Sequence, residues 1–230
     1  MNNQPQPTQF NYLSFFLIDD HALMLDIYIN MVEELKNPNE TFNFVKAVTF
    51  DEANQKLNAL QANKKNLDLA FIDLSLGPQE KSKTGGDVVK LIKDLFPHCT
   101  IIIITAFSNP SIAYNLTLET DIDIIFCKSD LNHESFAQML TFARQGQHYL
   151  SETIKTEFNL ITQRRLGLDH HDIAIIQCLS KGIKTKDLPD NVPLSLSAIE
   201  KRKAYLISHF SKGTDGKNNF LINIQKSGLL

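Results

Sequence analysis

Four short apolar runs in this chain each end in a polar side chain, and this pattern restricts the folds that the chain can adopt. The runs are residues 15–18, 69–72, 101–104 and 124–127. The polar residues that follow them are Asp19 and Asp20, then Asp73, Thr105 and Lys128. In an open parallel sheet the carboxyl ends of the strands form one edge, where ligands bind. If the runs are parallel strands, three carboxylates, a hydroxyl and an ammonium meet at that edge.

The segments between these runs have the spacing of amphipathic helices. We expect the first helix to present an apolar face made of Leu23, Ile27, Met31 and Leu35. We expect another strand over residues 42–50, with Asp51 capping the helix that follows it. Later helices are expected over residues 88–96, 112–119 and 132–145. The alternation predicts an α/β fold, in which a five-stranded doubly wound parallel sheet has helices on both faces.

The pattern changes near residue 146. Residues 12–145 are expected to form the α/β domain, residues 146–166 a linker, and residues 167–230 a small all-α domain. In the last segment Asp169 and Asp172 have the spacing of a helix-capping box.

Two later residues of this segment mark helix boundaries. Gly182 is placed to end the helix that the capping box opens. Ser195 or Ser197 is placed to cap a longer helix that reaches Phe210.

Composition argues against a membrane or secreted protein. No apolar run approaches the ~20 residues that span a bilayer. The first ten residues lack the basic start and the apolar stretch of a secretory signal. Cys99, Cys127 and Cys178 lie far apart and beside apolar residues, which indicates reduced core thiols rather than a zinc or redox site. We therefore expect a cytoplasmic protein with no membrane contact.

Charge is distributed unevenly along the chain. Residues 1–159 carry 12 Lys and Arg residues against 20 Asp and Glu residues, whereas residues 160–230 carry 11 against 6. Such a split indicates a basic module that meets nucleic acid, joined to an acidic partner domain. Two solvated surfaces of unequal composition are the alternative interpretation.

The polar groups at the sheet edge suit phosphoryl transfer. Asp73 can accept a phosphoryl group as a mixed anhydride, Lys128 supplies a positive charge for the phosphoryl oxygens, and Thr105 supplies a hydroxyl donor. Crowded carboxylates repel one another, and a Mg²⁺ ion removes that repulsion. Asp20 and Asp73 are predicted as direct Mg²⁺ ligands together with the backbone carbonyl of Ser75, and Asp19 is predicted to act through water.

These residues resemble the receiver domain of bacterial response regulators, which has a flavodoxin-like fold. The matching residues are Asp19-Asp20, Asp73, Thr105-Ala106, Lys128-Ser129 and the turn Gly85-Gly86-Asp87. The resemblance implies that a sensor histidine kinase donates phosphate to Asp73, and that Thr105 then turns toward the phosphoryl group.

The sequence departs from the receiver pattern at two places. The loop over residues 77–86 makes the segment between Asp73 and Gly85 longer than is usual in the family. The position of the family's aromatic switch residue holds Ile125, and the neighbouring Phe126 should point to the opposite face of its strand. The usual aromatic readout is therefore not expected here.

Residues 168–230 resemble the LuxR/FixJ-type helix-turn-helix output domain. The matching stretches are residues 168–172, 179–182, 186–188 and 194–199 and the closing residues 228–230. Pro189 and the loop up to Pro193 stand where the family continues its second helix. The resemblance implies sequence-specific binding of double-stranded DNA, with a homodimer as the active form.

The helix that starts near Ser197 has two distinct faces at about 100° per residue. Ile199, Leu206 and Phe210 form its core stripe. The opposite face carries Ser197, Glu200, Lys201, Ala204 and Ser208, and such a small, polar face suits the major groove. Arg202 and Lys203 are predicted to hold phosphates, with Lys184 and Lys186 as further phosphate contacts. An ordinary solvated helix face is the alternative.

Together the two segments predict a two-component transcriptional regulator rather than an enzyme. One rival is a signalling adaptor whose C-terminal helices bind protein. The other is an aspartyl-nucleophile hydrolase of the haloacid-dehalogenase type. Such hydrolases need a second acid two residues after the nucleophile, and this chain has Ser75 there.

Overall fold

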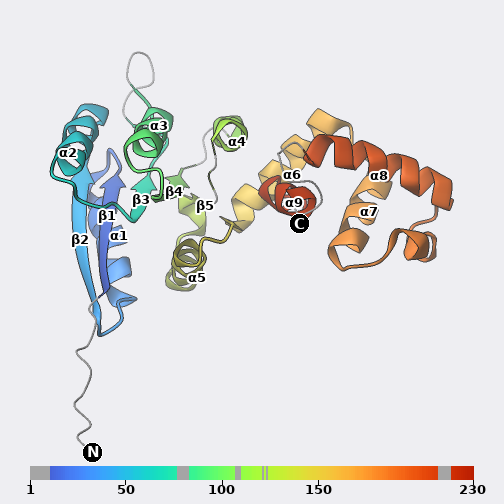
Figure 1. The fold of residues 1–230 in the computed structure, drawn as a ribbon, viewed down its shortest axis with the longest axis horizontal. Coiled ribbons are helices and arrows are strands. Elements are labelled where there is room, and N and C mark those ends of the chain that lie inside the picture. The colour runs from blue at the N-terminus through green and yellow to red at the C-terminus, as the bar shows by residue number, and fades with distance from the viewer. Residues whose placement is uncertain (1–10, 77–82, 107–109, 121, 123, 212–218) are drawn as a thin grey trace, which may run out of the picture. The chain divides into compact units, whose positions relative to one another are not determined.

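The computed structural model describes residues 11–76, 83–106, 110–120, 122, 124–211 and 219–230. The chain forms two compact units (Figure 1). One unit consists of Met1–Ser108 and Leu118–Ser151, and the other of Asn109–Thr117 and Glu152–Leu230. The expected boundaries at residues 145 and 166 remain predictions. The segment 146–166 is not a plain linker, because it contains both a strand and a helix.

The first unit is built on a parallel sheet with the strand order β2-β1-β3-β4-β5-β6. Its strands are β1 (Asn11–Ile18), β2 (Glu40–Ala47), β3 (Leu69–Ile72), β4 (Thr100–Thr105), β5 (Ile124–Cys127) and β6 (Tyr149–Leu150). The predicted parallel α/β fold is confirmed. The sheet has six strands instead of five, because residues 149–150 add a strand beside β5. Two residues are too few to show a strand pattern in the sequence.

Helices cover both faces of this sheet. The first unit contains α1 (Ala22–Glu34), α2 (Phe50–Ala62), α3 (Gly85–Leu95), α5 (His133–Arg144) and the short 3₁₀ helix η1 (Lys128–Asp130). Side chains of α1 and α5 share one buried cluster with Phe15, Leu17 and Phe71 of the sheet. Because successive strand residues point to opposite faces, Phe16 and Ile18, which are also buried, face the other side. Helices α2 and α3 lie next to each other in Figure 1.

The apolar face predicted for α1 is only partly right, because Met31 and Leu35 pack against the core cluster but Leu23 does not. Leu23 is 72% exposed, and the buried residues of the helix are Leu25, Tyr28 and Val32. The predicted set repeats every four residues, so at about 100° per residue it drifts around the helix, and its first member lies off the buried face. Steps of three and four, as in the observed set, keep side chains on one face.

Two helix starts also differ from expectation. The strand expected to reach residue 50 ends at Ala47, and α2 is capped by Thr49, whose hydroxyl accepts the Glu52 N–H at 3.2 Å. Asp51 lies inside the first turn instead, where its charge favours the helix N-terminus. Helix α3 begins at Gly85, three residues earlier than expected, because a capping box at Thr84 opens it.

The second unit is helical, as predicted. It contains α6 (Glu152–Leu166), α7 (His170–Ser180), the 3₁₀ helix η2 (Thr185–Asp190), α8 (Leu196–Phe210) and α9 (Asn219–Lys226). The capping box at Asp169 is confirmed, and Gly182 follows α7 with a φ of 80°. Of the two candidate caps of α8, Ser195 is the one used. Among the described residues, no helix is long and apolar enough to cross a membrane.

Helix α4 (Pro110–Glu119) belongs mainly to this second unit, although the sequence places it in the α/β domain. Tyr114 packs edge-on against Phe158 of α6, with ring centroids 5.1 Å apart. The buried hydroxyl of Thr162 donates to the Tyr114 hydroxyl at 2.9 Å. These contacts join α4 to α6 through a polar bond inside an apolar layer.

Candidate functional site

The carboxyl ends of β1 and β3 place two aspartates side by side. The strands are neighbours in the sheet, and Ile18 is paired with Ile72. Asp19 and Asp73 directly follow these residues, and the Asp73 N–H donates to the Ile18 carbonyl at 2.9 Å. Both aspartates are buried, with exposed fractions of 0% and 3%. Two neighbouring apolar strands thus place two buried carboxylates at the carboxyl end of the sheet.

Lys128 joins these carboxylates from the far side of β4. It follows β5, and its Nζ donates to Asp19 Oδ2 and to Asp73 Oδ2, each at 2.6 Å. The side chain therefore reaches past the end of β4 to Asp73, and past the ends of β4 and β3 to Asp19. The structure brings together three of the residues that the sequence singles out, although they are far apart in the chain.

Backbone groups fix the orientation of both carboxylates. The His21 N–H donates to Asp19 Oδ1 at 2.9 Å, and the Ser75 N–H donates to Asp73 Oδ1 at 3.1 Å. Asp20 is less buried, with a side chain 30% exposed, and its Oδ1 lies 2.7 Å from the Nδ1 of His21. Because the loops after β1 and β3 fold back on their own strand ends, the carboxylates are held at defined positions.

The electrostatics of the pocket favour an additional cation. Burial raises the pKa of Asp73 above its ordinary value, although bonds from Lys128 and Ser75 oppose the rise. Burial also disfavours the ammonium of Lys128, but its bonds to Asp19 and Asp73 hold its pKa above the usual range. One ammonium is thus shared between two carboxylates, and negative charge is left without full compensation.

The donor set fits a hard divalent cation. Carboxylate oxygens are the ligands that Mg²⁺ prefers, and Asp19, Asp20 and Asp73 end two neighbouring strands. Among the described residues, ligand atoms of Asp19, Asp20 and His21 all lie within 4.8 Å of one another. Asp73 is outside that group, and its Oδ2 is held by Lys128. The predicted role of the Ser75 carbonyl remains a prediction.

Thr105 and the switch position lie on the neighbouring strands. Thr105 is the last residue of β4, is 5% exposed, and is paired with Cys127, the residue before Lys128. Ile125 is fully buried. Phe126 belongs to the cluster of α1 and α5 and stacks on Tyr149, with centroids 6.2 Å apart. The prediction that Phe126 points away from the switch face is therefore confirmed.

The predicted long loop is mostly outside the described residues, which resume at residue 83. Its end makes a close approach to the acceptor. A Cβ built on Gly85 would lie 2.0 Å from the Asp73 carbonyl oxygen and 2.7 Å from the Leu74 Cα. Only glycine fits there, because real Cβ atoms essentially never come within 3.0 Å of other atoms. The Gly85 N–H donates to the Leu74 carbonyl at 3.2 Å, and this bond holds the two backbone segments together.

Two residues near the acidic pocket were not singled out from the sequence. Tyr28 of α1 is 2% exposed, and its hydroxyl lies 3.5 Å from Asp19 Oδ2. Burial, and secondly the charge of Asp19, raises the pKa of Tyr28 above its ordinary value. His21 contacts Asp20 directly. Its position right after the acidic pair was a usable signal, whereas Tyr28 has no sequence signal beyond a polar group on an apolar helix face.

The second unit presents the face that the sequence predicts on α8. Ile199, Leu206 and Phe210 are buried in its core cluster. The exposed residues of the helix include Ser197, Glu200, Lys201, Ala204 and Ser208. Lys184 and Lys186, near the start of η2, are exposed as well. The geometry thus leaves this set available, and its contact with DNA remains a prediction.

Two basic residues of α8 have partners within the second unit. The prediction that Arg202 holds a phosphate is not supported, because its Nη1 lies 2.9 Å from both Asp169 Oδ2 and Asp172 Oδ1. The guanidinium therefore ties α8 to the capped start of α7. Lys203 Nζ donates to Thr185 Oγ1 at 2.6 Å, so it bridges α8 to η2.

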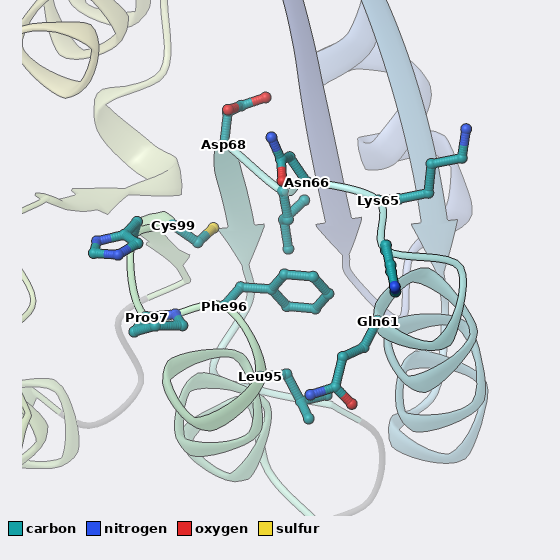
Figure 2. A pocket seen from close by; sticks show the side chains of 11 residues that line it. Gln61, Lys65, Asn66, Asp68, Leu95, Phe96, Pro97 and Cys99 are labelled. Atoms are coloured by element: carbon teal, nitrogen blue, oxygen red, sulfur yellow. The ribbon is translucent and has the colours of Figure 1, made fainter.

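A pocket of about 430 Å³ lies at the amino ends of β3 and β4, away from the carboxyl ends that carry the acidic residues (Figure 2). The ring of Phe96, one of the lining residues, lies near the centre of the view in Figure 2, and the side chain of Lys65 extends away from that ring. Asp68 Oδ2 accepts the Ser14 N–H at 2.7 Å, and burial raises the pKa of Cys99 to about 12. The acid and the thiol are thus engaged or un-ionised, and none of the predicted site residues lines this pocket.

Comparison with known proteins gives a consistent picture. No family model matches the chain. The chain is 23% identical over 196 residues to the transcriptional regulatory protein RcsB of Salmonella typhi, and the match covers 84% of this chain and 86% of that protein. RcsB of Escherichia coli strain K12 gives the same identity and coverage.

Solved structures agree at the level of the fold. A structure of two RcsB dimers bound to two parallel DNAs has a TM-score of 0.51 at 19% identity, covering 94% of this chain and 99% of that chain. An RcsB response regulator of Salmonella typhimurium, described for its conformational dynamism in DNA interaction, has a TM-score of 0.52 at 19% identity and the same coverage. The likeness thus extends over both units of the chain.

Proposed function

Because this chain is a homologue of the response regulators that join a receiver domain to a LuxR/FixJ-type helix-turn-helix domain, we propose that it is a DNA-binding transcriptional regulator controlled by phosphorylation of Asp73. The phosphate donor in this proposal is a sensor histidine kinase, and the active form is a homodimer. We place the protein in the cytoplasm, where such regulators meet DNA. The observation that carries the proposal is the buried contact of Lys128 with Asp19 and Asp73.

The chemistry follows from that contact. An Asp73 carboxylate oxygen attacks the phosphorus of the donor, a bond from that oxygen to phosphorus forms, and the bond from phosphorus to the leaving group breaks. Lys128 is already within 2.6 Å of Asp73 and turns its charge to the phosphoryl oxygens. Mg²⁺ held by Asp19, Asp20 and Asp73 would neutralise the charge that gathers there. Positioning and charge compensation supply most of the rate enhancement.

The site favours a switch over a hydrolase. An aspartyl hydrolase needs a second acid two residues after its nucleophile, and here Ser75 stands at that position, with its N–H bonded to Asp73. Thr105, buried at the end of the neighbouring strand β4, is the proposed hydroxyl partner of the phosphoryl group.

The second unit supplies the proposed DNA contact. The exposed face of α8 is small and polar near its start, and Lys201 projects from it. Lys201 can bond a guanine edge or a phosphate, and Glu200 can accept from a cytosine amine. Lys184 and Lys186 are proposed as phosphate contacts. Lys203 is proposed to act indirectly, because its bond to Thr185 sets the position of η2 against α8.

Labelling with acetyl phosphate and Mg²⁺ tests the acceptor. The wild-type chain is expected to take one phosphoryl group, and Asp73→Asn is expected to abolish the label, because the amide cannot form the anhydride. Asp94→Asn is the matched control, since Asp94 is exposed on α3. Label that survives in Asp73→Asn would remove the assignment of the acceptor.

Duplex binding at several salt concentrations tests the output role. Lys201→Ala is expected to weaken binding and to reduce the salt dependence by about one counterion. Lys65→Ala makes the same change of charge in the first unit and is expected to leave binding unchanged. If a truncated chain ending at residue 150 binds duplex as strongly as the full chain, α8 is not the DNA contact, and a protein partner for the second unit becomes the better proposal.

A further inference from the structure

Ser151 makes two hydrogen bonds to β5, the strand that ends just before Lys128. It directly follows β6 and is 1% exposed. Its N–H donates to the Ile125 carbonyl at 3.1 Å, and its hydroxyl oxygen accepts the Cys127 N–H at 2.9 Å. The two bonds attach Ser151 to β5 at the residues before and after Phe126. The ladder between β5 and β6 is thus extended by a side chain at the point where the backbone pairing ends.

These bonds hold the backbone next to Lys128. Cys127 is its immediate neighbour in the chain and is paired with Thr105 of β4 on the other side. The N–H of Cys127 is buried and must keep an acceptor, because an unpaired buried N–H costs free energy comparable to a lost hydrogen bond. Among the described contacts, the Ser151 hydroxyl is the acceptor that it has. The backbone that carries Lys128 is therefore held from the segment after β6.

The same residue also stands at the boundary of the two units. The first unit ends at Ser151, and the second resumes at Glu152, the first residue of α6. No residue separates Ser151, which bonds to β5, from the first residue of α6. The chain therefore has no spacer between the residue that bonds to Cys127 and the first residue of α6.

We propose that Ser151 is a positioning residue that holds Lys128 toward Asp73 and couples the state of the phosphoryl site to α6 through the backbone of β5. The proposal rests on the proposed function and specifies how its site is regulated. It accounts for Ile125, which is buried and carries no polar group at the position of the aromatic switch. When Lys128 turns from Asp73 to the phosphoryl oxygens, Cys127 moves, and Ser151 follows because the buried N–H keeps its acceptor.

The test compares Ser151→Ala with the conservative Ser151→Thr in the full chain. The alanine removes the acceptor, whereas threonine keeps a hydroxyl. With acetyl phosphate and Mg²⁺, Ser151→Ala is expected to lower the maximal labelling rate roughly tenfold, because small misplacements of a charge-compensating group act on the transition state. The concentration of acetyl phosphate that gives half the maximal rate is expected to stay unchanged. Ser151→Thr is expected to restore the rate.

The coupling has a separate readout in amide hydrogen exchange. Beryllofluoride with Mg²⁺ serves as the phosphoryl probe, and peptides from β5 and from residues 152–166 are followed. In the wild type the probe is expected to change exchange in both peptides, whereas in Ser151→Ala the change in α6 is expected to fall severalfold. Ser129→Ala is the matched control, since its hydroxyl contacts the sulfur of Cys127 and not the backbone.

The outcomes separate the two proposals. If Ser151→Ala labels at the wild-type rate and transmits the probe to α6 as the wild type does, Ser151 has no positioning role. An equal loss in Ser151→Ala and Ser151→Thr also overturns the proposal, because the hydroxyl is then not the active group. A wild-type chain that takes no label removes the proposed function itself, whatever the Ser151 variants do.

Discussion

Replacing Gly85 by alanine perturbs the acceptor without touching its side chain. The added Cβ would lie 2.0 Å from the Asp73 carbonyl oxygen, and that neighbour is backbone rather than the end of a flexible side chain. Because Gly85 opens α3 and its N–H bonds the Leu74 carbonyl, either the helix start or the end of β3 must shift. Relief of the contact needs a movement of about 1.5 Å, since ordinary carbon contacts lie near 3.5 Å.

Two effects of different size follow from this movement. Forcing extra volume into a tightly packed site destabilises a protein by about 1–3 kcal/mol. Misplacing a reacting group by about 1 Å slows a reaction on the order of 10²-fold. We therefore expect Gly85→Ala to stay folded, because a domain is stable by about 5–15 kcal/mol, and to lose most of its labelling by acetyl phosphate.

Initial labelling rates and denaturant unfolding, measured on the same samples, check this prediction. Gly146→Ala is the control for exchanging glycine, since its Cβ meets nothing within 4 Å and only its φ of 63° is unfavourable. That variant should lose about 1 kcal/mol and label normally. Wild-type labelling and wild-type stability in Gly85→Ala would refute the reasoning, because the backbone contact with Asp73 would then not constrain the acceptor.

Two further predictions concern the ends of helices. Arg202→Met is expected to cost about 1.5–3 kcal/mol of unfolding free energy, because it leaves Asp172 buried without its cation. A double-mutant cycle with Asp172→Asn should show coupling, and strictly additive losses would contradict it. Backbone bonding to Thr84 lowers the pKa of Asp87, so its contribution is present above about pH 3.9 and is lost as pH falls through the folded pKa. Asp87→Asn should therefore lose about 1 kcal/mol at neutral pH and match the wild type in acid, and a difference independent of pH would contradict this.

The sequence is informative where one physical signal dominates. Apolar runs that end in Asp19, Asp73 and Lys128 predict parallel strands and a common edge, because a buried strand tolerates a charge only past its end. The capping box at Asp169 and the terminating Gly182 are local signals of the same kind, and they are read correctly. The exposed face of α8 follows from helical periodicity alone.

Features that depend on contacts between segments far apart in the sequence could not be predicted from it. Whether Arg202 meets a phosphate or a carboxylate depends on α7, which lies far away in the sequence. Ser151 and β6 depend on an open edge of β5, and a two-residue strand leaves no periodic signal. The short contact of Gly85 with Asp73 appears only when the loop is closed. The grouping of α4 with the second unit depends on the partner of Tyr114.

Duplex DNA affinity before and after treatment with acetyl phosphate and Mg²⁺ tests the central claim most directly, when it is measured for the wild type and for Asp73→Asn in parallel. The account predicts a change of affinity in the wild type and none in the variant, because only the wild type carries the acceptor. A wild type that takes the label and binds DNA with unaltered affinity, or a variant that responds as the wild type does, would contradict the claim that Asp73 controls the output unit.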